Sequence, residues 1–310
     1  MEAQVAFFIN KYVEELTEEN AAIFAGAGLS VAAGIVDWKN LLLPIAQQLG
    51  LDISKEHDLV SLAQHHCNER SGNRHELNQR LINEFSKGHA ITENHRILAR
   101  LPIRTFWTTN YDRLIEKALE DTGKIADVKY TVKQLALTKA KRDAIVYKMQ
   151  GDVEHPDDAV LTKDDYERYH IDRQPFVTAI SGDMVSKTFL FLGFSFTDPN
   201  LDYILSRIRV TFTTSQRQHY CIFKKRKRAQ SEAEDYLYDA LKQELAIKDL
   251  KRFNITALLV DEYSEITTIL KAIEDRFCQK TVLISGSANV YGEFAAPEKF
   301  IQDLSQLLIQ

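Results

Sequence analysis

Apolar positions recur along the chain at two different spacings. At the N-terminus they follow the i, i+3, i+4, i+7 spacing of an amphipathic helix, at Val5, Phe8, Ile9, Tyr12, Val13 and Leu16. Short apolar runs predict strands at residues 21–26, 105–109, 145–149, 188–193, 219–223, 255–260 and 281–286. Helical spacing separates them, notably at residues 41–49, 58–69, 111–120, 199–209 and 231–247.

Strands that alternate with helices indicate an α/β fold, with a mostly parallel sheet covered by helices on both faces. Residues 34–105 contain helical patterns but no convincing strand. We therefore expect a helical insertion beside the sheet, placed to form one wall of a cleft.

The composition of the chain restricts the classes of protein to which it can belong. The chain has 310 residues, 45% of them hydrophobic, which suffices for more than one core, and its net charge of −5 does not suggest a nucleic-acid partner. Cys67, Cys221 and Cys278 are too few and too far apart for a disulfide framework or a four-cysteine zinc module. The longest uncharged run, residues 20–36, has neither the flanks nor the length of a signal peptide or membrane span. We expect a cytoplasmic protein without nucleic-acid or membrane partners.

The first predicted strand runs into the glycine-rich stretch AGAGLSVAAGIVDW. Gly26, Gly28 and Ser30 suit a phosphate site, because glycines let the backbone approach a phosphate and a following helix supplies N–H donors. The match to the usual dinucleotide fingerprint is poor, since Val31 stands at the third glycine. A tight strand-to-helix turn without a ligand explains the same residues.

Three further strand exits carry small or polar residues. Asn110 and Asp112 follow the second strand, Gln150 follows the third, and the glycine-serine turn of Gly193 and Ser195 follows the next. Asn and Asp are also ordinary helix N-caps. Four such exits in succession nevertheless favour a nucleotide cleft at the carboxyl edge of the sheet.

The stretches GAGLSVAAGIVDW, TTNYD, QGD and GFSFTDPNL together resemble the motifs of the sirtuin-type NAD-binding fold. Within that superfamily the chain is most similar to the sirtuin-like, NAD-hydrolysing subunit of the Thoeris anti-phage defence system. The resemblance implies a Rossmann-like sheet of sirtuin type without a zinc module, NAD+ as the substrate, no metal, and a homo-oligomer. The N-terminal helix is a candidate contact between copies, although an apolar stripe is more often core.

The resemblance also assigns roles at the site. It implies that Asn110, Asp112 and the residue at position 150 are catalytic. It implies NAD+ contacts from Ala25, Gly26, Ala27, Gly28, Ser30, Asp37, Thr109, Gly193 and Ser195.

Position 150 departs from the family pattern, which places a histidine there. Gln150 can form hydrogen bonds but has no basic nitrogen that titrates near neutral pH. We therefore expect NAD+ hydrolysis weakened by Gln150. The alternatives are a catalytically weak NAD-binding regulatory module and, less favoured, an NAD-dependent protein deacylase.

The C-terminal stretch resembles the beginning of a SLOG-type nucleotide-sensing domain, which in the family reads a cyclic ADP-ribose-type signal. We expect residues 1–279 to form the sirtuin-like domain and residues 280–310 to begin the SLOG domain, with 281–286 as its first strand. One strand and one helix cannot complete such a domain. The sequence is thus expected to be a fragment of a longer protein.

Overall fold

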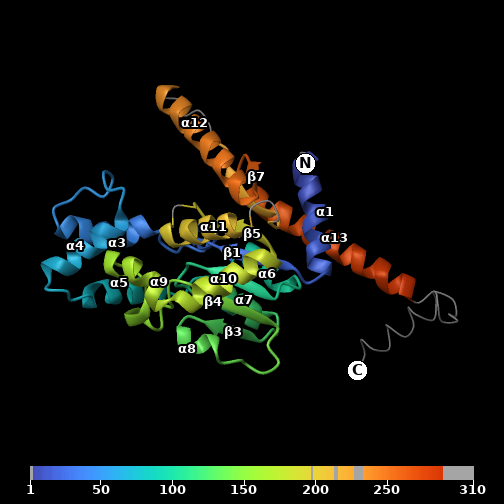
Figure 1. Ribbon diagram of the computed structural model, residues 1–310, viewed down its shortest axis with the longest axis horizontal. Coiled ribbons are helices and arrows are strands. Elements are labelled where there is room, and N and C mark those ends of the chain that lie inside the picture. The colour runs from blue at the N-terminus through green and yellow to red at the C-terminus, as the bar shows by residue number, and fades with distance from the viewer. Residues whose placement is uncertain (1–2, 197, 213–215, 227–232, 289–310) are drawn as a thin grey trace.

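The computed structural model describes residues 3–196, 198–212, 216–226 and 233–288, and its centre is a seven-stranded sheet (Figure 1). The strand order is β3-β4-β2-β1-β5-β6-β7, and every pair of neighbours is parallel. The strands are β1 (Ala21–Ala25), β2 (Thr105–Thr108), β3 (Ala126–Lys129), β4 (Ala144–Lys148), β5 (Thr188–Leu192), β6 (His219–Lys224) and β7 (Ile255–Val260). The expected parallel α/β sheet is confirmed.

Alternate residues of the central strands enter two different cores. Ile23 and Leu190 belong to a core on one face of the sheet, whereas their neighbours Phe24 and Phe191 belong to a core on the other. A strand covered on both faces needs apolar side chains at every position, which explains its uninterrupted apolar run.

Helices cover each face of the sheet. The first face packs against α1 (Ala3–Thr17), α6 (Glu93–Arg100), α7 (Leu114–Asp121) and α13 (Ser264–Ala288). The second packs against α9 (Lys163–Asp172), α10 (Gln174–Ser186) and α11 (Pro199–Phe212), with α8 (Val132–Leu135) and the short 3-10 turn η2 (Lys251–Phe253) beside them. The 3-10 turn η1 (Pro156–Asp158) lies between β4 and α9, and α12 (Ala233–Leu250) runs outward from the β6–β7 edge (Figure 1).

The apolar stripe of α1 is part of the core. All six of its predicted apolar positions are buried, and α1 lies against α13. The core interpretation of this helix is therefore confirmed, and the stripe is not an exposed surface of the chain.

The helical insertion is also confirmed. After the short helix α2 (Ala27–Val31), the insertion comprises α3 (Trp38–Gln48), α4 (Leu59–Glu69) and α5 (His75–Phe85), which extend to one side of the sheet (Figure 1). These helices share a small core of their own, which includes Tyr111 after β2 and Leu161 after β4. The insertion is thus packed against the carboxyl edge of the sheet.

Two predictions about strands were wrong. The edge strand β3 was missed, because it is only four residues long and contains the charged residues Asp127 and Lys129. The strand expected at 281–286 is instead the end of helix α13. No described strand lies beside this segment, and a helix satisfies its backbone hydrogen bonds internally, whereas a lone strand cannot. The rest of the expected SLOG segment, 289–310, lies outside the described residues.

Candidate active site

The order of the strands fixes where a ligand would bind. From β1 the chain builds the sheet in one direction through β2 and β4, and from β5 it builds in the other. Ligands of open α/β sheets bind outside the carboxyl ends of the strands, where the direction reverses. The exits of β1 and β5 flank that point, so the glycine turns after these strands come together there.

The turns after β1 and β5 pack directly against each other. The N–H of Gly26 donates to the carbonyl oxygen of Leu192 at 2.9 Å, and the N–H of Gly28 donates to that of Gly193 at 2.9 Å. A Cβ atom on Gly26 would lie 2.5 Å from the Gly193 oxygen, and Gly193 has a φ of +64°. Only glycine tolerates such an approach. Packing alone therefore requires these glycines, as the explanation without a ligand allowed.

Ser30, Asn110 and Asp112 form one hydrogen-bonded cluster. The Ser30 hydroxyl donates to Asp112 Oδ2 at 2.8 Å, and Asn110 Nδ2 donates to Ser30 Oγ and to the Gly26 carbonyl oxygen, both at 3.1 Å. All three side chains are buried. The structure thus brings together residues that are 80 positions apart in the sequence.

Further hydrogen bonds join this cluster to the end of β2 and to the start of α7. Asp112 Oδ1 accepts from the N–H of Leu114, the first residue of α7, at 2.9 Å, while the N–H of Asn110 donates to Thr108 Oγ1 at 2.9 Å. The N-cap position of α7 is held by Arg113, so the N-cap function suggested by the sequence does not apply to Asp112. Hydrogen bonds to fixed partners hold the side chains in one arrangement before any ligand binds.

A buried lysine joins the exits of β2 and β4. Lys148 Nζ lies 2.5 Å from Asp152 Oδ2 and 3.1 Å from Glu116 Oε1, and it donates to the carbonyl oxygens of Tyr111 and Asp112 at 3.1 and 2.6 Å. The Lys148 side chain is completely buried. A buried ammonium is stable only when its donors are paired, and here the partners come from the loops after β2 and β4 and from α7.

Electrostatics in this cluster follow from burial and pairing. Burial raises the pKa of Glu116 despite the opposing charge of Lys148. Burial alone would lower the pKa of Lys148, but the Glu116 and Asp152 carboxylates outweigh it, and the pKa is raised. Sequence reasoning missed Lys148 and Glu116. The available signal was a lysine inside the apolar run of β4, four residues before an acid.

Gln150, just after β4, faces a different set of partners. Its Nε2 donates to the Tyr166 hydroxyl at 2.8 Å and also to Asp198 Oδ2. Its Oε1 lies 3.4 Å from the Tyr111 hydroxyl, which is closer to the Val160 carbonyl oxygen at 2.7 Å. Since a hydroxyl carries one proton, Tyr111 donates mainly to Val160.

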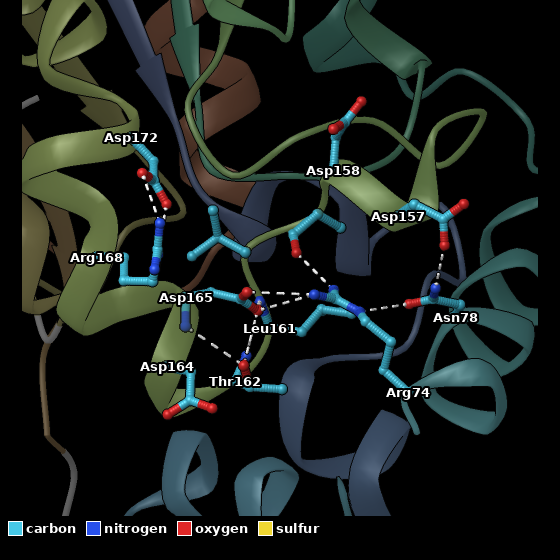
Figure 2. Close-up of polar contacts among 12 residues, drawn as sticks. Arg74, Asn78, Asp157, Asp158, Leu161, Thr162, Asp164, Asp165, Arg168 and Asp172 are labelled. Atoms are coloured by element: carbon cyan, nitrogen blue, oxygen red, sulfur yellow. Dashed lines mark hydrogen bonds and ion pairs between the residues drawn. The ribbon is translucent and has the colours of Figure 1, made fainter. Parts of the chain in front are cut away.

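The helical insertion holds the loop beside Gln150. Arg74 Nη1 lies 3.2 Å from Asp165 Oδ1, and Arg74 Nη2 donates to the Ala159 carbonyl oxygen at 2.7 Å (Figure 2). Asn78 donates to Asp157 at 2.7 Å (Figure 2). These contacts link α5 to residues 156–165, the segment whose Val160 N–H binds the Gln150 carbonyl oxygen. The insertion therefore packs against the loop beside Gln150, and its function as one wall of a cleft stays a prediction.

The other predicted site residues lie around these clusters. Ala25 ends β1, and its carbonyl oxygen accepts from Thr108 Oγ1 at 2.9 Å and from the N–H of Thr109 at 3.4 Å. Ala27 begins α2. Asp37 is exposed and caps α3 by accepting from the N–H of Asn40 at 2.8 Å. No contact joins Asp37 to the Ser30–Asp112 cluster in the described part of the chain.

Ser195 lines a pocket on the β5–β6 side of the site. The pocket has a volume of about 200 Å³ and lies between α11, α12 and η2. Its walls are mainly apolar and aromatic, and include Phe196, Phe223 and Phe253. Such a lining, with a polar turn at one side, suits a flat aromatic group.

A SIR2-like domain model matches residues 104–246, which span β2 to α12 and include the site residues that follow β2, β4 and β5. This match covers less than half of the chain. The Rossmann-like sheet of the chain agrees with that match. A second family model, the Sir2- and TIR-associating SLOG family, matches residues 265–310 and begins within α13.

The chain is also similar to curated proteins over nearly its whole length. It is 61% identical over 99% of its residues to the NAD(+) hydrolase ThsA of Bacillus cereus (strain MSX-D12), and 56% identical over 100% to that of Acinetobacter baumannii (strain 532279). The NAD(+) hydrolase ThsA of Enterococcus faecium is 48% identical. The chain spans 65% and 64% of the lengths of the first two proteins.

The described residues contain neither a candidate membrane span nor a candidate metal site. None of the helices there is both long and apolar enough to cross a membrane. Within the same ranges, no three or more His, Cys, Asp or Glu side chains are grouped so as to hold a metal ion.

Proposed function

We propose that this chain binds NAD+ and hydrolyses it to nicotinamide and ADP-ribose, slowly because of Gln150. The observation that carries the proposal is the Ser30–Asn110–Asp112 cluster at the switch point of a SIR2-like sheet. The similarity of the chain to an NAD(+) hydrolase over 99% of its residues also supports the proposal.

We assign the NAD+ molecule to the carboxyl edge of the sheet, where it extends from the exit of β5 to the exits of β2 and β4. The pyrophosphate lies at the turn of Gly26, Ala27, Gly28 and Ser30. Because the N–H groups of Gly26 and Gly28 already bind backbone oxygens and the Ser30 hydroxyl donates to Asp112, the N–H of Ala27 is the donor of this turn that we assign to the phosphate oxygens. The adenosine lies toward Gly193 and Ser195, with the adenine in the aromatic pocket beside Ser195.

The nicotinamide ribose then lies over the β2 and β4 exits, with Ala25, Thr109, Asp37 and Asp112 at its edge. Both amide protons of Asn110 are directed to protein oxygens, so its Oδ1 is the atom assigned to accept from a ribose hydroxyl or the attacking water. The bond between nicotinamide nitrogen and ribose breaks through an oxocarbenium-like state, and nicotinamide leaves as a neutral molecule. Water adds to the ribose carbon and loses one proton.

Position 150 is assigned to receive that proton, and glutamine cannot take it. An amide is neither an acid nor a base near neutral pH, so the step depends on solvent. Loss of a general base lowers rates by roughly 100-fold to 10,000-fold.

One observation favours a second function, that of an NAD-binding regulatory module. Both protons of the Gln150 amide bind protein acceptors, so the side chain can complete a binding site without taking part in turnover. The deacylase alternative has no such support.

The wider role is proposed from the same similarities. We assign the chain to a cytoplasmic, homo-oligomeric effector of Thoeris-type anti-phage defence, which depletes NAD+ when its SLOG domain reads a cyclic ADP-ribose-type signal. The match of residues 265–310 to a Sir2- and TIR-associating SLOG family supports the signal-binding part. The domain division at residue 280 remains a prediction.

The test compares NAD+ binding, by calorimetry, with nicotinamide release over hours at high protein concentration. We expect binding with slow release, and loss of release by about 100-fold or more in Asn110→Ala, because the water and ribose lose their positioning group. Asn83→Ala, on the exposed side of α5, is the matched control. Binding without any release supports the regulatory module, and absence of binding contradicts both functions.

A further inference from the structure

The amide of Gln150 has a defined orientation in the structure. Its Nε2 carries two protons and faces two acceptors, the Tyr166 hydroxyl at 2.8 Å and the Asp198 carboxylate. An ionised carboxylate only accepts hydrogen bonds, so the NH2 end and not the oxygen must point toward Asp198. Tyr166 and Asp198 are therefore placed to accept hydrogen bonds from the side chain at position 150.

Asp198 is held in place independently of residue 150. Its Oδ1 accepts from the N–H groups of Asn200 and Leu201 at 2.8 and 3.2 Å, at the start of α11. Its Oδ2 is the oxygen that faces Gln150. One oxygen thus caps a helix while the other is directed into the proposed active site. A cap alone requires only the first contact.

The surroundings of Asp198 are enclosed and aromatic. Tyr166 from α9 contacts Gln150, and Tyr111 after β2 and Tyr169 of α9 lie close enough to experience the charge of Asp198. The charges of Asp165, Arg74 and Arg173 also act on Tyr111. Burial raises the pKa of Asp198, and its hydrogen bonds oppose that rise.

We propose that Asp198 is a positioning residue that orients the side chain at position 150 toward NAD+. The inference rests on the proposed function for its purpose and on the Gln150 contacts for its geometry. With an imidazole at position 150, one ring N–H donates to Asp198 and the other ring nitrogen accepts the proton released by a ribose hydroxyl or water. The positive charge that forms is then stabilised by the carboxylate. With glutamine, Asp198 orients a side chain that has no basic nitrogen.

The experiment uses Gln150→His with and without Asp198→Asn. Asparagine caps helices as well as aspartate does, so α11 keeps its cap while position 150 loses the charge. The pKa of the introduced imidazole is measured by NMR titration of its ring carbon signal. We expect it to be lower by about one pH unit or more in the double variant, because a nearby opposite charge favours the imidazolium. An unchanged pKa overturns the proposal.

Nicotinamide release supplies the second readout. We expect Asp198→Asn to lower kcat of the Gln150→His protein by about 10-fold to 100-fold, the size typical of a lost orienting partner, with little change in KM. Asp58→Asn, which alters the N-cap of α4 in the same way, is the matched control and leaves kcat unchanged. A lower pKa with an unchanged kcat contradicts a positioning role.

The two readouts separate this proposal from the proposed function. If no variant releases nicotinamide but the pKa difference is present, hydrolysis by this chain is contradicted while the pairing of Asp198 with position 150 is supported. Tyr166→Phe tests the other acceptor. It removes a hydroxyl without changing the charge, so we expect a smaller change in the imidazole pKa than Asp198→Asn produces.

Discussion

On the β1–β2 side of the proposed site Ser30, Asn110 and Asp112 bind one another, whereas on the β4–β5 side Gln150 binds Asp198 and Tyr166. The first side has the residue types of the sirtuin pattern, and its contacts would persist without a ligand. The second side holds a residue outside that pattern. Glutamine and histidine can both donate to Asp198, so the residue type there can change while the fold is kept. The residue types of the proposed binding side are thus required by the fold, whereas the residue type at the proposed catalytic position is not.

The largest expected effect is on the rate of nicotinamide release, and it distinguishes the two sides of the proposed site. Gln150→His supplies a basic nitrogen, and we expect nicotinamide release to rise by about 100-fold to 10,000-fold, while the Kd for NAD+ changes little because the binding side is untouched. Initial rates and calorimetry measure the two quantities. Gln79→His, on exposed α5, controls for the added imidazole. Equal rates in the two variants would show that position 150 is not the missing base.

The next effect is on stability. It tests the contacts by which Lys148 of β4 supports the residues that follow β2. Lys148→Met removes the buried ammonium and leaves Glu116 and Asp152 without their partner, so we expect the free energy of unfolding to fall by about 3 to 5 kcal/mol. Urea unfolding measures it. Lys117→Met, at an exposed position of α7, should remain within about 0.5 kcal/mol of the starting protein. Similar losses in both variants would argue against the buried cluster as the support of these residues.

The third effect concerns acid stability, because each side of the sheet contains a buried histidine. Burial lowers the pKa of His95, which lies near Asp112, and burial and then Arg217 lower the pKa of His219 to about 4. The unfolded chain therefore binds a proton at His219 more readily than the native protein. Stability is complete above pH 6.5 and falls as the pH drops toward 4, by about 3 kcal/mol for His219 alone.

His219→Asn isolates the contribution of the β5–β6 side. Asparagine does not titrate, and its oxygen can replace Nδ1, which accepts from the N–H of Phe189 at 3.1 Å. We expect the free energy of unfolding, measured between pH 7 and pH 4, to depend less on pH in this variant than in the starting protein. His57→Asn, at an exposed position, should retain the full dependence. If both variants behave alike, His219 does not contribute to acid sensitivity.

Much of the fold could be predicted because burial on both faces leaves a simple pattern. The apolar runs of β1, β2, β4, β5, β6 and β7 were found, as were the helical insertion and the core face of α1. β3 was missed because an edge strand with Asp127 and Lys129 does not show this pattern. Residues 281–286 were assigned wrongly because a short apolar run suits either a strand or a helix, and its surroundings decide.

The residues of the candidate site also form two groups, those that the sequence could predict and those that it could not. Residues that follow strands directly, such as Asn110, Asp112 and Gln150, could be predicted from position alone. Lys148, Tyr166 and Asp198 could not, because the contacts that place them at the site join residues 16 to 48 positions apart, and the sequence does not show which elements meet.

By itself, the sequence determined the parallel sheet, the strand exits that carry polar residues, and the glutamine at position 150, because these depend on local spacing and residue type. Only the tertiary structure decided that Gly26 and Gly28 are required by contact with Gly193, that Lys148 joins two loops, and that Gln150 faces Asp198. The physical reason is that burial and pairing set the energy of polar groups, and both arise only when distant elements pack together.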